Sequence, residues 1–261
     1  MRRAAAFALV AGALLAGTLL AGTLFAAAPA HAAQGVNLSW SRCHGEGVGT
    51  QNATFACDAN VGGEVLVASF VLDAPLEQVS GNGIVIDLIS QDDPLPAWWD
   101  FKNVGACRQS SLRFNTDANL GDVVCVDWGV GKSTGGIGAY NNELGTIDPS
   151  LVSRHRRIKV ALAVPMTAAM DLLADTEYFS CNLVIDHAKT VGADACGGCA
   201  GSVCLVFTSI RVTTLTPASD RIFSSAVTPG SNMIHWQGTG ADCLLVPVRN
   251  QSWGQVKSLY R

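Results

Sequence analysis

The nine cysteines have the clearest capacity for chemistry in this chain, since thiols form disulfides, bind metals or transfer electrons. Cys196-Gly-Gly-Cys199 has the spacing of a redox dithiol, but Gly, Ala and Asp surround it where a redox motif would open a helix. A structural crosslink therefore fits better, and a zinc site of Cys196, Cys199, Cys204 and one further ligand is the alternative. We expect eight cysteines to form disulfides, namely Cys43, Cys57, Cys107, Cys125, Cys196, Cys199, Cys204 and Cys243.

The spacing of the cysteines also predicts two of the pairings. Cys43 and Cys57 flank a glycine-rich segment between two expected strands, and a hairpin there would bring their Cα atoms to the ~5.5 Å that a disulfide requires. Cys107 and Cys125 bracket an Asx-rich stretch in the same way, so we expect this pair to be bonded as well. Cys196, Cys199, Cys204 and Cys243 should supply two more bridges, and the sequence leaves their pairing open.

Because nine is odd, one cysteine must remain without an intramolecular partner, and we expect this to be Cys181. It lies in an apolar run with an alternating pattern, on the strand face that carries Phe179, Leu183 and Ile185. A thiol in such a position acts as a small buried hydrophobic group.

An oxygen-rich loop is the best candidate for a metal site. Calcium prefers several oxygens from alternate residues of a glycine-containing loop, and Asn115, Asp117, Asn119 and Asp122 provide them. However, the glycine comes one position late and no glutamate closes the loop, so turns in which Asx side chains accept backbone hydrogen bonds are the favoured alternative. We expect no cofactor, with calcium at this loop as the one possibility.

The sequence offers little material for catalysis. No serine stands in a nucleophile elbow, and Asp87 and Asp127 lie in apolar strands, where a buried carboxylate needs a partner. Basic partners across the sheet are available, namely Arg157 and Lys159. An enzyme is therefore less expected than a binding protein. The alternative is a secreted hydrolase, which would have to gather His187 or His235 with a carboxylate in one cleft.

Two adjacent tryptophans, Trp98 and Trp99, are the most suggestive candidates for binding. Exposed aromatic rings on a proline-flanked loop can stack on sugar rings, so an extracellular carbohydrate or protein is the expected partner. The favoured interpretation of the pair, however, is a hydrophobic plug that closes the end of a β-sandwich, since Leu95 and Phe101 lie beside it.

The elements that must position these residues are mostly strands. Alternating or continuous apolar runs predict about ten strands separated by glycine, asparagine and proline turns, with one or two short helices. The glycine-rich stretch 129–138 contains Gly-Lys-Ser without the first glycine of a phosphate-binding loop, so we interpret it as a connection. The pattern predicts an all-β fold, an antiparallel jelly-roll-like sandwich over residues 33–249, with a helical tail at 250–261. At fold level it is similar to cohesin or carbohydrate-binding modules, an analogy that implies no function.

The first 32 residues have the pattern of a cleaved signal peptide. Arg2 and Arg3 precede a long apolar run that ends in Ala30-His31-Ala32. The expected location is therefore secreted, periplasmic or at a bacterial cell surface, without membrane insertion after cleavage. A formal net charge of −4, which becomes more negative without the leader, gives no reason to bind nucleic acid.

The leader generates a direct prediction. Signal peptidase should cut after Ala32, so N-terminal sequencing of the exported chain should begin at Ala33. A substitution of Ala32 by a bulky residue should block cleavage and leave the longer form attached to the membrane fraction. An exported chain that retains Arg2 and Arg3 in the wild type would contradict the prediction.

Overall fold

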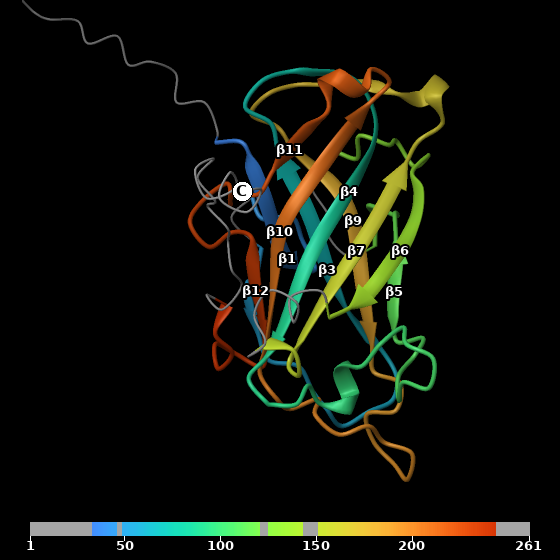
Figure 1. The fold of residues 1–261 in the computed structure, drawn as a ribbon, viewed down its shortest axis with the longest axis vertical. Helices are drawn as coiled ribbons and strands as arrows, with labels where there is room; N and C mark the ends of the chain where they lie inside the picture. The colour runs from blue at the N-terminus through green and yellow to red at the C-terminus, as the bar shows by residue number, and fades with distance from the viewer. Residues whose placement is uncertain (1–32, 46–48, 121–124, 143–150, 244–261) are drawn as a thin grey trace, which may run out of the picture. The chain divides into compact units, whose positions relative to one another are not determined.

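In the computed structural model the chain divides into two units, Met1–Ala30 and His31–Arg261. Residues 33–45, 49–120, 125–142 and 151–243 are described, so the predicted leader (1–32) and helical tail (250–261) lie outside the described residues. The described residues form two β-sheets that pack face to face (Figure 1). No helix among them is long and apolar enough to cross a membrane.

The smaller sheet has four strands and the larger sheet has eight. In spatial order the small sheet contains β1 (Gly35–Trp40), β3 (Gly63–Val71), β9 (Glu177–Asp186) and β5 (Leu112–Asn115). The large sheet contains β2 (Asn52–Ala53), β12 (Met233–Trp236), β10 (Val203–Thr214), β4 (Leu76–Ser90), β7 (His155–Ala163) and β6 (Thr134–Asn141), with β11 (Arg221–Phe223) on β10 and β8 (Met170–Leu172) on β4. Every strand pair is antiparallel except β2–β12.

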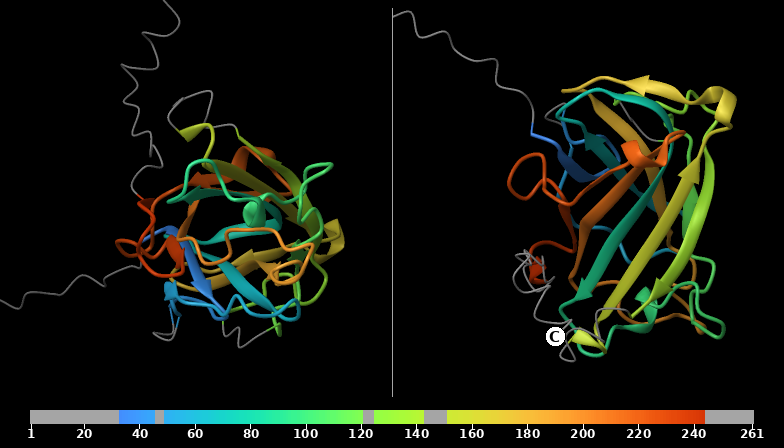
Figure 2. Two further views of the ribbon diagram at one scale, coloured as in Figure 1. Left: turned by 90° about the horizontal axis from the view of Figure 1, so that it is seen from below. Right: turned by 45° about the horizontal axis from the view of Figure 1, so that its top comes forward.

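The core lies between the two sheets and follows from the alternation of apolar residues along the strands. Leu66 and Phe70 of β3 and Ile84 and Ile86 of β4 belong to one buried cluster that both sheets share. Side chains of a strand alternate between its faces, so each of these residues contributes to the layer between the sheets. The predicted all-β antiparallel sandwich is therefore confirmed, and the end-on view shows the two layers (Figure 2).

Individual strands depart from the prediction where glycine or a bulge intervenes. The stretch interpreted as a connection contains most of β6, because pairing with β7 outweighs the low strand preference of its glycines. Cys181 is buried and unpaired as expected, and burial raises the pKa of its thiol to about 12. A bulge at Ser180, however, turns Phe179 to the outer face of the small sheet, away from Cys181.

The short helices are three-residue 3₁₀ turns. The described residues contain η1 (Ala97–Trp99), η4 (Met166–Ala168) and η5 (Pro217–Ser219). The first lies across one end of the sandwich, where it is drawn as a green coil in Figure 2 (left). Its position matters because it carries both tryptophans that the sequence singled out.

All eight cysteines expected to be oxidised form disulfides, but both predicted pairings are wrong. The bonds join Cys43–Cys125, Cys57–Cys199, Cys107–Cys196 and Cys204–Cys243. The two cysteines of the Cys-Gly-Gly-Cys motif are thus bonded to separate partners and leave no dithiol. Gly198 has φ +112° and a Cβ there would collide with the Pro96 side chain, so the motif is a tight structural turn.

The pairing errors have a topological cause. The hairpin expected around Cys43 and Cys57 does not form, because β2 pairs with β12 of the large sheet and leads Cys57 to Cys199. Beyond β5, Val126 forms a bridge with Tyr178 at the edge of β9. The segment that follows β1 also reaches β9, where the N–H groups of His44 and Gly45 donate hydrogen bonds to the Glu177 carboxylate. Cys125 therefore arrives beside Cys43. The spacing of the cysteines along the chain could not indicate that β2 pairs with β12 or that Cys125 lies beside Cys43.

These bonds predict a graded loss of stability. Cys57→Ser with Cys199→Ser removes a crosslink between positions 142 residues apart, and the free energy of unfolding should fall by about 4–5 kcal/mol. Cys181→Ala, which breaks no bond, should cost only about 1 kcal/mol. Denaturant unfolding measures both, and peptide mapping without reduction checks the pairings. A Cys43–Cys57 or Cys107–Cys125 peptide would contradict the structure.

Candidate functional site

The tryptophan pair is fully buried at the end of the sandwich. Trp98 and Trp99 have no exposed surface, and their rings contact Trp236 of β12 with centroid distances of 5.0 and 5.2 Å. Rings packed edge-on or tilted in this way exclude water and close the core. The expectation that they bind a carbohydrate by stacking has no support in this geometry, and the favoured interpretation, a hydrophobic plug, describes what they do.

A buried arginine holds the plug in place, and sequence reasoning missed it. The Arg108 guanidinium lies 3.5 Å from the Trp98 ring centroid and donates hydrogen bonds to the carbonyls of Trp98, Ala188 and Asp186. Burial lowers its pKa to about 10, so it stays protonated at neutral pH. No pattern around Arg108 distinguishes it from a surface arginine, because its partners are backbone carbonyls and an aromatic face.

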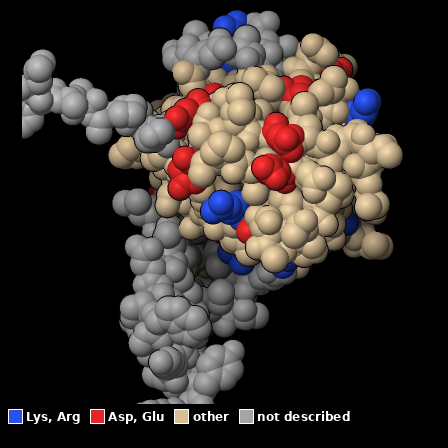
Figure 3. Space-filling model, turned by 90° about the horizontal axis from the view of Figure 1, so that it is seen from above, with Lys and Arg blue, Asp and Glu red and all other residues tan. Residues whose placement is uncertain are grey.

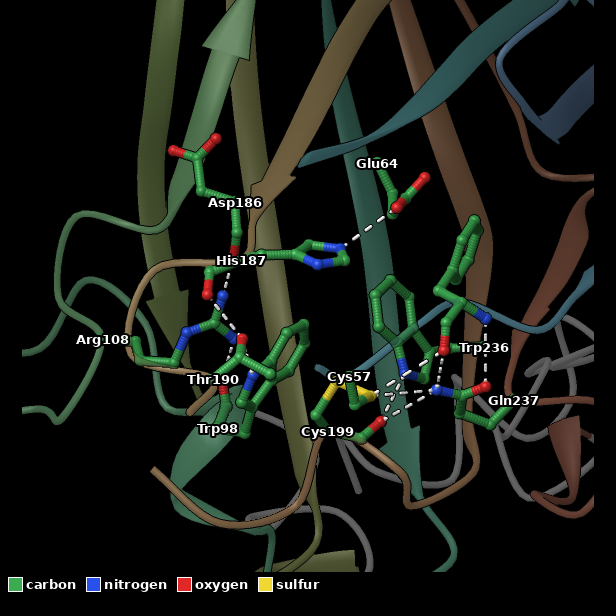
Figure 4. Close-up of polar contacts among 11 residues, drawn as sticks. Cys57, Glu64, Trp98, Arg108, Asp186, His187, Thr190, Cys199, Trp236 and Gln237 are labelled. Atoms are coloured by element: carbon green, nitrogen blue, oxygen red, sulfur yellow. Dashed lines mark hydrogen bonds and ion pairs between the residues drawn. A yellow bond between two sulfur atoms is a disulfide. The ribbon is translucent and has the colours of Figure 1, made fainter. Parts of the chain in front are cut away.

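His187 lies beside this plug and approaches a carboxylate, as Figure 4 shows. Its Nε2 is 3.1 Å from Oε1 of Glu64, although Nε2 is buried and makes no well-directed hydrogen bond. The nearest hydroxyl in this group, that of Thr190, donates to the His187 carbonyl and accepts from the Trp98 indole. Among the described residues, no hydroxyl group hydrogen-bonds to the buried Nε2 of His187.

A second charged cluster crosses the large sheet between β4 and β7. Asp87 is fully buried and accepts two hydrogen bonds of 2.8 Å from Arg157 and one of 2.9 Å from His155 Nε2. Burial by itself would raise the pKa of Asp87, but the hydrogen bonds from Arg157 and His155 outweigh it and hold the pKa below 3.8. The partner that the sequence proposed, Arg157, is confirmed, and His155 was missed.

Asp127, the other carboxylate in an apolar run, fills a turn. Its two oxygens accept hydrogen bonds from the backbone N–H groups of Gly129 and Gly131 at 3.0 and 2.8 Å. This is the ordinary use of an Asp side chain at the start of a glycine-rich turn. Asp127 therefore positions the chain ahead of β6 and does not approach a histidine within the described contacts.

His235 lies next to a disulfide. Its Nε2 is 3.4 Å from Sγ of Cys243, and burial lowers the His235 pKa. With Cys204, these residues place three potential metal ligands within 4.8 Å of one another, but the two sulfurs are bonded to each other. The zinc alternative fails for the same reason, because Cys196, Cys199 and Cys204 are all in disulfides and offer no thiolate.

The loop proposed for calcium is built of Asx turns over its described part. Asn115 accepts a hydrogen bond from the Asp117 N–H at 2.6 Å, and Asp117 accepts one from the Asn119 N–H at 2.9 Å. Asp122 lies outside the described residues. These side-chain oxygens already satisfy the local backbone, so calcium at this loop stays a prediction.

Three surface hollows are lined by described residues, and none of the three includes a histidine. One, of about 420 Å³, holds Arg113, which donates two hydrogen bonds to Asp186 at 2.6 and 2.7 Å. The largest, of about 500 Å³, lies at the end opposite the tryptophan plug and includes Glu77 and Asp220. Figure 3 looks onto that end and shows acidic and basic side chains scattered among neutral ones.

The class of protein that these observations define is an all-β sandwich with four disulfides, in which the described tryptophans are buried. No protein-family model, curated protein or solved structure matches the chain.

The buried Asp87 cluster yields a prediction about pH. Asp87→Asn removes the buried carboxylate that accepts hydrogen bonds from Arg157 and His155, so the free energy of unfolding at neutral pH should fall by about 3 kcal/mol. The folded-state pKa of Asp87 is depressed, so its stabilisation is present above pH 4 and is lost as the pH falls through the folded value. Urea titrations between pH 2 and 7 should therefore show a flatter acid limb in D87N.

The matched control is Glu77→Gln, an exposed carboxylate on the same strand, β4. It should change the free energy of unfolding by about 0.5 kcal/mol or less. If D87N and E77Q have the same acid limb, Asp87 does not carry the pH dependence.

Proposed function

We propose that this chain is a secreted, disulfide-stabilised β-sandwich module that binds an extracellular protein or contributes to an extracellular assembly at a bacterial surface. One observation carries the proposal. The clusters that could have served catalysis or sugar stacking lie inside the fold, with Trp98, Trp99 and Asp87 fully buried. What remains available to a partner is the outer surface of the sheets and loops.

An oxidising destination supports this proposal. Four disulfides join positions between 39 and 142 residues apart, and such bonds persist in secreted proteins and not in a reducing cytosol. The leader pattern at residues 1–32 agrees with that destination. Disulfides that crosslink both sheets would keep the module folded in an extracellular environment, where chaperones do not refold it.

A protein partner is favoured over a carbohydrate because of where the aromatic rings lie. Sugar recognition by stacking needs a flat, accessible ring, whereas the indoles of Trp98, Trp99 and Trp236 are all turned into the core. Protein interfaces use exposed backbone edges and aliphatic groups, and both remain on this surface.

The second candidate is the secreted hydrolase, and the contact between His187 and Glu64 is the observation in its favour. A histidine 3.1 Å from a carboxylate is the pairing that a general base needs. The burial of Nε2 counts against it, since a proton on a substrate could reach that atom only after the Trp98 end opens.

The two candidates are separated by one set of assays on residues 33–261 with the disulfides intact. We expect saturable binding to a secreted or surface protein fraction and no binding on a glycan array. The binding should disappear after reduction and alkylation, because the loops are held by the four bonds. Saturable binding to a glycan would contradict the preference for a protein partner.

The hydrolase is tested in parallel with ester, glycoside and peptide substrates. We expect no turnover by the wild type beyond that of His187→Ala. Turnover that H187A and Glu64→Gln both abolish, while Glu77→Gln retains it, would establish the hydrolase in place of the binding module.

A further inference from the structure

The Cys204–Cys243 disulfide differs from the other three in having a histidine beside its sulfur atoms. Ligand atoms of Cys204, His235 and Cys243 lie within 4.8 Å of one another, and Nε2 of His235 is 3.4 Å from Sγ of Cys243. No other three histidine, cysteine or carboxylate ligands gather this closely among the described residues. In the described part of the chain, the other three disulfides therefore lack a comparable third ligand.

The large sheet fixes two of these three ligands. Cys204 lies opposite His235 in the antiparallel pair of β10 and β12, so their side chains share one face of the sheet (Figure 1). β10 is an inner strand here, because Ile89 of β4 lies opposite Cys204 on its other side. The N–H of His235 donates to the Gln51 carbonyl, and the His235 carbonyl accepts from the Trp40 indole. Both backbones are thus held from two sides.

Cys243 brings the third ligand from a segment outside the strands. Zinc bonds of about 2.3 Å to sulfur and about 2.0 Å to nitrogen separate the ligand atoms of a tetrahedral site by about 3.5–3.8 Å. Nε2 of His235 and Sγ of Cys243 are already close to this spacing, at 3.4 Å. Only the two sulfurs are too close, because their covalent bond holds them about 2 Å apart. Once that bond opens, the Cys243 sulfur has to move by less than about 2 Å to complete the site.

The surroundings favour a divalent ion that prefers thiolate and imidazole ligands. The two cysteines lie in an apolar cluster that includes Ile89 and Val206. A net charge is costly there, but Zn²⁺ with two thiolates and a neutral imidazole has none. Zinc is commonly bound by these ligand types, and three protein ligands leave its fourth position to water. The half-buried His235 gives the ion and this water access from the surface.

We propose that Cys204, His235 and Cys243 form a zinc site that the disulfide closes and that reduction opens. A dithiol supplies two electrons and two protons. Its own sulfurs join in a disulfide, the bond between Cys204 and Cys243 breaks, and each of these cysteines becomes a thiol. Zn²⁺ then replaces the two thiol protons, which pass to solvent, and a ring nitrogen of His235 completes the protein ligands. Exchange with a disulfide oxidant reverses both steps and releases the ion.

The zinc site goes beyond the proposed function, because it concerns a metal ion and not the protein partner. Its test is the redox equilibrium of the four disulfides in residues 33–261, in buffers of reduced and oxidised dithiothreitol, with and without zinc at a free concentration set by a chelator. Alkylation followed by peptide mapping gives the reduced fraction of each cysteine.

Zinc should make the Cys204–Cys243 bond easier to reduce, because an ion that binds only the reduced form stabilises that form. At a free zinc concentration about ten times the Kd, half-reduction should need a ratio of reduced to oxidised dithiothreitol that is about tenfold lower. The equilibria of the other three disulfides should not shift.

A histidine substitution tests the third ligand. His235→Asn keeps a polar side chain but removes the imidazole, so zinc should bind at least about tenfold more weakly, since even residues that only support a zinc ligand contribute about 10–100-fold. At the same free zinc concentration the shift should then largely disappear. The matched control is His44→Asn, because His44 follows Cys43 in the chain but belongs to no such group of ligands. It should leave the shift unchanged.

Cobalt(II) provides a second measurement that needs no variant. Added to the reduced wild type, it should give the charge-transfer absorption of cobalt–thiolate bonds, and added to the oxidised chain it should not.

Four results would overturn the proposal. These are no zinc-dependent shift, an equal shift of all four disulfides, a shift of wild-type size in H235N, and no cobalt–thiolate absorption after reduction. The partner-binding assays keep all four bonds intact, so the zinc site and the proposed function can fail separately.

Discussion

Burial of the indole rings at one end of the sandwich is the constraint on which the arrangement of its loops depends. Trp98 and Trp99 are neighbours in η1, whereas Trp236 lies far away in sequence, and the three rings are buried against one another. Burying an aromatic side chain stabilises by about 2 kcal/mol or more, so a loop that failed to close would forfeit a large part of the net stability. Two disulfides, Cys57–Cys199 and Cys107–Cys196, tie the same end together.

The polar groups near the core follow from this closure. Where the 97–108 segment meets the end of β9, backbone carbonyls from both need donors. Arg108 donates to the carbonyls of Trp98, Asp186 and Ala188 while it stacks on Trp98. An arginine suits this position because it keeps its charge when buried and presents several N–H groups in a plane. On the large sheet the buried charge is negative instead. The Asp87 carboxylate there is balanced by Arg157 and accepts a hydrogen bond from His155. Both charged side chains, Arg108 and Asp87, therefore connect neighbouring segments of the fold.

The same architecture leaves the sheet edges with unequal protection. Ser225, Ser231 and Thr50 accept backbone hydrogen bonds from β1, whereas the described residues give β6 one strand partner, β7. Glycine in a strand usually weakens it, yet β6 is ordered by its pairing with β7, with a bulge at Gly138.

The sequence by itself determined the features that depend on neighbours along the chain. Alternation predicted the all-β sandwich and strands such as β9, and the count of cysteines with the apolar setting of Cys181 predicted which thiol stays free. Only the tertiary structure decided what depends on which strands become neighbours in space. It paired Cys43 with Cys125, buried Trp98 and Trp99, and ordered β6, because pairing energies and crossings between distant segments leave no period or spacing in the sequence.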